Sequence, residues 1–160
     1  MRSTLRLCSF LLAPTLFLSI TPTVSAAVDE PVPDAQTLAQ MELRAQQANP
    51  RDQCFLYTEL VHTMTNVAIK QIASGDDDKA STTLQQVNRY AHMIESSLLK
   101  NTKKLKNAEI LMDRTTAHLT EALHLTSGAQ RTNVQATLKQ LGALPAVLDK
   151  PVLLRIGDFE

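Results

Sequence analysis

The stretch that decides the fold is residues 80–126, ASTTLQQVNRYAHMIESSLLKNTKKLKNAEILMDRTTAHLTEALHLT. Apolar side chains recur in it at alternating spacings of four and three residues, which is the pattern of a helix that buries one face. No glycine or proline lies between Asp76 and Gly128 to break such a helix. We therefore expect one long central helix over about residues 77–126, packed in the manner of a coiled coil. The series comprises Ala80, Leu84, Val87, Ala91, Ile94, Leu98, Asn101, Leu105, Ala108, Met112, Thr115, Leu119, Ala122 and Thr126.

One polar interruption in this series leaves a second arrangement open. Asn101 and Thr102 lie at the middle of the stretch, where a break would divide the helix into two halves. Two halves joined there would fold back into a compact bundle, whereas the unbroken helix would give a rod of two successive hairpins.

Shorter helices are expected on both sides. Asp34 is placed to cap a first helix that ends at Asn49-Pro50, and a second helix fits residues 51–73, with Gly75 as its stop. A last helix begins after Gly128 and is expected to end before Pro145. The fold class is therefore all-α, with antiparallel helical hairpins or a bundle.

A weak internal repeat accompanies this pattern. Residues 72–75 read Ile-Ala-Ser-Gly, and residues 125–128 read Leu-Thr-Ser-Gly. Each turn is followed by a related segment, Thr-Leu-Gln-Gln-Val at 83–87 and Thr-Leu-Lys-Gln-Leu at 137–141. Each half of the chain is thus expected to supply one helical hairpin.

The first residues resemble a secretory signal. Arg2 and Arg6 precede an apolar run over residues 7–20, and Val24-Ser25-Ala26 offers the small side chains that a signal peptidase needs. We expect a signal peptide over 1–26, a flexible lead-in over 27–33, a helical domain over 34–148 and a C-terminal tail over 149–160. The mature chain would be periplasmic or extracellular and would contain no membrane span.

Charge and residue content exclude several function classes. Removing the signal leaves fourteen basic against sixteen acidic residues, so nothing draws the chain to nucleic acid. Neither a Gly-x-Ser-x-Gly sequence nor a glycine-rich phosphate loop is present, and Cys54 has no histidine at helical neighbour spacing. We expect neither catalysis nor a cofactor, and we expect Cys54 to be buried.

A pair of Glu-x-x-His sequences is the sharpest chemical pattern. Glu59 with His62, and Glu121 with His124, alternate along the chain with glutamates on other helical segments. This order is similar to that of the ferritin-like di-metal proteins, whose carboxylates and histidines project into a four-helix core. That resemblance implies metal binding in a compact bundle. The helical periodicity instead places these side chains away from the apolar faces, so our first expectation is that no metal binds there.

A basic cluster, comprising Lys100, Lys103, Lys104 and Lys106, lies in the middle of the central stretch. It is suited to an acidic partner or an anionic polymer of the cell envelope, or it is simply a solvated face. Long amphipathic helices without a convergent polar set favour an interaction, scaffold or chaperone-like protein. We therefore expect a protein partner, and wide apolar faces also make a homodimer plausible.

Overall fold

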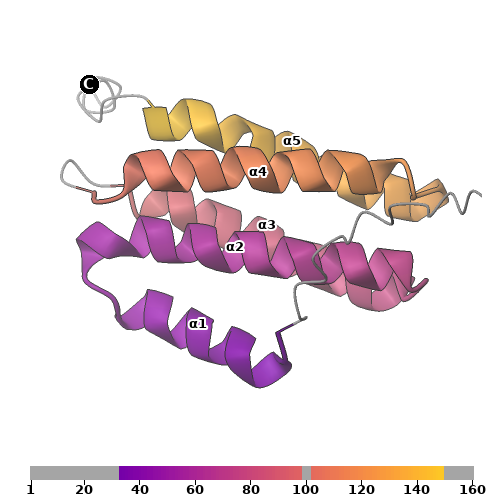
Figure 1. Ribbon diagram of the computed structural model, residues 1–160, viewed down its shortest axis with the longest axis horizontal. Helices are drawn as coiled ribbons and strands as arrows, with labels where there is room; N and C mark the ends of the chain where they lie inside the picture. The colour runs from indigo at the N-terminus through magenta and orange to yellow at the C-terminus, as the bar shows by residue number, and fades with distance from the viewer. Residues whose placement is uncertain (1–32, 99–101, 150–160) are drawn as a thin grey trace, which may run out of the picture. The chain divides into compact units, whose positions relative to one another are not determined.

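The computed structural model describes residues 33–98 and 102–149, and every regular element within them is an α-helix (Figure 1). The all-α prediction is therefore confirmed. The predicted signal peptide, residues 27–32 of the lead-in and residues 150–160 of the tail lie outside the described residues. The helices are α1 (Ala35–Gln47), α2 (Pro50–Ala73), α3 (Asp77–Ser96), α4 (Leu105–Leu123) and α5 (Gly128–Asp149).

Two side-chain caps fix the starts of α1 and α2. The carboxylate of Asp34 accepts a hydrogen bond from the backbone N–H of Thr37 at 2.8 Å. The side-chain carbonyl of Asn49 accepts one from the N–H of Arg51 at 3.0 Å. Pro50 occupies the first position of α2, where its fixed φ fits the helix and no N–H is required. Both helices therefore begin within a residue of their predicted starts.

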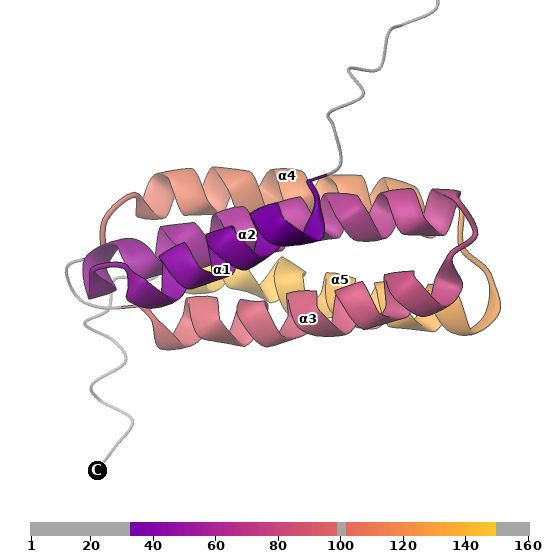
Figure 2. The ribbon, with the colours of Figure 1, turned by 90° about the horizontal axis from the view of Figure 1, so that it is seen from below.

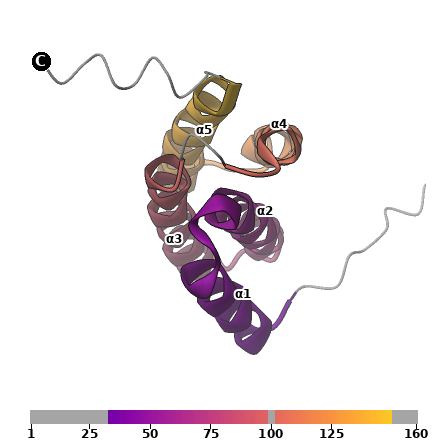
Figure 3. The same cartoon turned by 90° about the vertical axis from the view of Figure 1, so that its left-hand side faces the viewer.

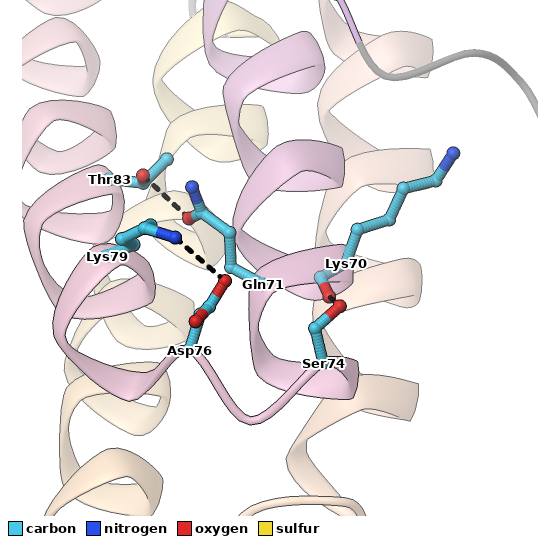
Figure 4. A network of polar contacts seen from close by, with 6 residues as sticks. All are labelled: Lys70, Gln71, Ser74, Asp76, Lys79 and Thr83. Atoms are coloured by element: carbon cyan, nitrogen blue, oxygen red, sulfur yellow. Dashed lines mark hydrogen bonds and ion pairs between the residues drawn. The ribbon is translucent and has the colours of Figure 1, made fainter.

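The turn after α2 closes the first hairpin. Gly75 has φ 76°, a left-handed conformation that glycine adopts without a steric penalty. The Ser74 hydroxyl donates to the carbonyl of Lys70 at 2.9 Å (Figure 4). The N–H of Asp76 reaches the carbonyl of Gln71 at 2.9 Å. The last carbonyls of α2 are thereby satisfied while the chain reverses.

Polar side chains also join α2 to the start of α3 (Figure 4). The Thr83 hydroxyl donates to the side-chain oxygen of Gln71 at 2.8 Å. Asp76 occupies the N-cap position of α3, but its carboxylate makes no capping hydrogen bond. It pairs instead with the ammonium of Lys79 at 3.0 Å.

The prediction of one continuous helix over residues 77–126 is wrong, because α3 ends at Ser96 and α4 begins at Leu105. Two serines end α3. The Ser96 hydroxyl donates to the carbonyl of Met93 at 3.1 Å, and the Ser97 hydroxyl donates to that of Ile94 at 2.9 Å. Such local bonds give the backbone an alternative to continuing the helix.

The connection that follows is attached to the start of α2. The N–H of Lys103 donates to the carbonyl of Arg51 at 2.8 Å. Lys104 has φ 58°, a left-handed conformation that interrupts a right-handed helix. The chain therefore folds back, and the compact bundle is the arrangement that the structure adopts.

Two antiparallel hairpins, α2 with α3 and α4 with α5, lie side by side (Figures 1 and 2). Helix α2 also packs on α4, and α3 packs on α5, whereas the backbones of the diagonal pairs lie farther apart within the described residues. Seen from the end, α1, α3 and α5 lie along one side, and α2 and α4 along the other (Figure 3). The chain thus alternates between two rows of helices.

The second hairpin runs in the same direction as the first. Side-chain hydrogen bonds between the hairpins join residues 52 or 53 positions apart. Because the two residue numbers rise together, α4 is parallel to α2 and α5 is parallel to α3. The two Ser-Gly turns of the sequence repeat are therefore equivalent turns of two stacked hairpins. The pairs are His62–Thr115, Asn66–His118, Ser81–Asn133 and Asn88–Gln140.

The core is built from the predicted apolar stripe. Its members are buried from Ala80 to Ile94 on α3 and from Ala108 to Ala122 on α4, and Leu105 at the start of α4 is partly buried. Helix α2 contributes a broader buried face, including Leu60 and Val61.

Helix α1 packs on α2 and reaches α3 through an ion pair, which lies beside an aromatic contact between α2 and α3. Tyr57 of α2 stacks on Tyr90 of α3, with ring centroids 6.2 Å apart. The guanidinium of Arg89 donates to the Tyr90 hydroxyl at 2.7 Å and pairs with the Glu42 carboxylate of α1 at 3.3 Å. Burial raises the pKa of both tyrosines. The first helix is thus attached to both members of the first hairpin.

The prediction that the last helix ends before Pro145 is also wrong. Helix α5 continues through this proline to Asp149. Proline removes one backbone hydrogen bond from a helix, but Leu144 and Leu148 on either side of it are fully or almost fully buried. Burial of these leucines favours continuation of α5 over a stop at the proline.

Candidate functional site

The four residues of the two Glu-x-x-His sequences do not form one site. Glu59 and His62 lie partly exposed on α2, whereas Glu121 and His124, at the end of α4, are exposed. Within residues 33–98 and 102–149, no group of three or more His, Cys, Asp or Glu side chains is placed to hold a metal ion. The compact bundle forms, but the pattern does not project into its core as the ferritin-like arrangement requires.

His62 takes part instead in a polar contact between α2 and α4. Its Nδ1 lies 2.8 Å from the hydroxyl of Thr115, which donates to the carbonyl of Leu111 at 2.7 Å and so accepts from the imidazole. Asn66 bridges the two helices, 3.3 Å from His62 and 3.4 Å from His118. The two imidazole rings lie 6.1 Å apart. These contacts fix the register of α4 on α2.

Cys54 is fully buried, as predicted. Desolvation raises the pKa of its thiol to about 11, against a smaller opposite effect of a hydrogen bond with Ser97. A thiol with such a pKa is protonated at neutral pH, so it is a poor nucleophile and a poor metal ligand. Its position is that of a small apolar core residue.

The basic cluster of the sequence is divided by the break before α4. Lys106 pairs with Glu109 at 2.8 Å, and Lys103 lies 3.9 Å from the carboxylate of Asp52. Lys104 places its ammonium 4.6 Å from the centre of the Phe55 ring, a cation–π contact with α2. Lys100 lies outside the described residues. The lysines therefore serve different local contacts instead of one solvated face.

An open groove of about 680 Å³ lies beside Lys104. Helix α1 and the start of α2 supply nearly all of its lining, and Lys104 adds the start of the second hairpin. Its apolar surface comes from Leu43, which is 51% exposed, and from the partly buried Phe55 and Leu56. The lining comprises Gln40, Leu43, Arg44, Gln47, Ala48, Asn49, Asp52, Phe55, Leu56 and Lys104.

The charge of this groove is positive. Arg44 and Lys104 both line it, and neither has a carboxylate within ion-pairing distance among the described residues. Asp52, the one acidic residue of the lining, is partly balanced by Lys103. An apolar surface with two uncompensated cations is suited to a ligand that is both apolar and acidic.

Sequence reasoning found Lys104 but missed the groove. Leu43 and Arg44 lie on a helix whose docking on α2 no local pattern predicts. The available signal was the large apolar pair Phe55-Leu56, which lies beside the buried stripe of α2 and extends its apolar surface towards solvent.

A comparison with protein-family models found no matching family, and comparisons with curated proteins and with solved structures found no significant match. Within the part of the chain that the structure describes, no helix is both long and apolar enough to cross a bilayer.

Proposed function

We propose that this chain is an exported, non-catalytic interaction protein of the cell envelope, acting as a scaffold, an adaptor or a chaperone-like holder. The observation that carries the proposal is the open groove between α1 and α2, where Leu43, Phe55 and Leu56 offer apolar surface. Arg44 and Lys104 line the same groove, and neither has a carboxylate partner among the described residues. Clusters of accessible apolar side chains with a polar rim are typical of protein-binding surfaces.

Export is supported by the sequence of residues 1–26, with its basic start, apolar run and small residues before Ala27. The proposed site of action is the periplasm or the cell exterior. Fractionation of expressing cells and N-terminal analysis of the protein test this part. Export predicts a mature chain that starts at Ala27 outside the cytoplasm, and an uncleaved cytoplasmic chain would contradict it.

Interaction is tested by a photo-crosslinking amino acid at position 43, inside the groove. The matched control carries the same group at position 136, an exposed position of α5. We expect one discrete adduct from position 43 in intact cells and none from position 136. Absence of any adduct, or equal labelling from both positions, would contradict a partner in the groove.

A further inference from the structure

We propose that the groove binds an acidic amphipathic helix of a partner protein, a segment with an apolar stripe flanked by Asp or Glu. This inference rests on the proposed function and specifies the chemistry of the partner. It is drawn from three features of the groove: its shape, the composition of its floor and the position of its charges.

The open shape and the apolar floor of the groove favour a helix as its ligand. Small-molecule sites enclose most of their ligand, whereas this groove is open and leaves Leu43 half exposed on one wall. Phe55 and Leu56 supply an apolar floor between α1 and the start of α4. A helix lying on such a floor buries side chains spaced three and four residues apart, the recurring mode of helix-in-groove recognition.

The charges of the groove favour acidic residues on both sides of the apolar stripe of the partner helix. Arg44 comes from α1, and Lys104 comes from the start of α4, so the two cations approach the floor on α2 from different elements. Carboxylates on either side of an apolar stripe would meet one cation each. Because the chain without residues 1–26 has fourteen basic against sixteen acidic residues, this attraction is local to the groove.

Lys104 is also held in a costly conformation. Its left-handed backbone, with φ 58°, is one that residues other than glycine rarely adopt. This backbone accompanies an ammonium placed above Phe55 instead of beside a carboxylate. The break before α4 requires this backbone, which thereby sets the position of the ammonium beside the groove.

The test measures the binding of two synthetic peptides to the full chain by fluorescence anisotropy. Both are helical peptides of about sixteen residues with the same Leu and Phe stripe, one flanked by Glu and the other by Lys. The test variant is Arg44→Glu with Lys104→Glu. Its matched control is Arg114→Glu with Lys139→Glu, which makes the same change in net charge at exposed positions on α4 and α5. Circular dichroism verifies that both variants keep the helical content of the parent.

We expect the Glu peptide to bind the parent chain and the control variant with affinities within twofold of each other. The groove variant should bind this peptide at least tenfold more weakly and should instead prefer the Lys peptide. Raising the salt concentration should weaken the binding of the Glu peptide to the parent.

Equal binding of both peptides to the parent, or equal losses in the groove and control variants, would overturn the inference. Binding of oleate or of phosphatidylglycerol vesicles, without binding of the Glu peptide, would also overturn it and assign the groove to an anionic amphiphile. A crosslink from position 43 that persists in the groove variant would support a partner in the groove, as the proposed function states. It would overturn only the inference that this partner is an acidic helix.

Discussion

Two buried threonines give a sharp prediction about the core. Thr65 on α2 and Thr137 on α5 are fully buried, and their hydroxyl oxygens have no hydrogen-bond partner among the described residues. A buried hydroxyl without a partner destabilises the native state by about 1–3 kcal/mol. Threonine and valine have nearly the same shape, so each Thr→Val change replaces the unpaired hydroxyl with a methyl group.

We expect Thr65→Val and Thr137→Val each to raise the free energy of unfolding by about 1–2 kcal/mol, the desolvation penalty plus a small gain from apolar burial. The backbones of α2 and α5 do not approach each other closely within the described residues, so we expect the two effects to add. A domain of this size gains about 4 °C in Tm for each kcal/mol. The double variant should therefore melt roughly 8–16 °C higher than the parent, given the same relation.

The assay is urea denaturation monitored by circular dichroism, with Thr115→Val as the matched control. Thr115 is also fully buried, but its hydroxyl contacts His62 and the carbonyl of Leu111. Its replacement removes both bonds and should lower the free energy of unfolding by about 1 kcal/mol. If Thr65→Val and Thr137→Val destabilise the protein as much as Thr115→Val does, the hydroxyls of Thr65 and Thr137 have hydrogen-bond partners in the native state, and the prediction is refuted.

Three further predictions concern packing, backbone and thiol chemistry. Leu119→Ala should lower the free energy of unfolding by about 2–5 kcal/mol, whereas Leu125→Ala, at a position 69% exposed, should change it by less than about 0.5 kcal/mol in the same urea assay. Gly142→Ala should raise the free energy of unfolding by about 0.5–1 kcal/mol, because the added Cβ meets open space in a helix. Gly75→Ala should lower it by about 1–2 kcal/mol, because φ there is 76°. Equal effects of the two changes would contradict the assigned conformations. In a Cys8→Ser chain, Cys54 should react with Ellman's reagent at pH 8 only after unfolding, since its pKa is raised to about 11 and it is buried. Fast labelling of this native chain would contradict the burial.

The sequence predicts the local structure of this protein well because its helix boundaries carry local signals. Asp34 caps α1, Pro50 begins α2, and Gly75 turns the chain after it, each through a backbone preference that does not depend on the rest of the fold. The buried stripe is also predictable, since periodicity identifies which side of a helix is apolar.

Periodicity does not identify the partner of that apolar side, and the long-helix prediction failed for this reason. The stripes of α3 and α4 keep their four-three spacing across the connection, so one long helix and two folded-back helices share the same pattern. The break depends on weak local preferences, the hydroxyls of Ser96 and Ser97 and the left-handed Lys104, together with burial that is gained only when the hairpins meet. The groove was missed for the same reason, because it exists only after α1 docks.

The central claim is that the two hairpins lie side by side and parallel, and a disulfide between α3 and α5 tests it most directly. Ser81 and Asn133 are in side-chain contact at 3.1 Å. A rod with a continuous helix would place residue 133 beside the second half of that helix, at least about 30 Å from residue 81 at 1.5 Å per residue. We predict that Ser81→Cys with Asn133→Cys, in a Cys8→Ser and Cys54→Ala background, forms an intramolecular disulfide on mild oxidation of the native monomer, detected by peptide mass mapping. Failure of this bond to form, with the chain still helical, would contradict the stacked arrangement.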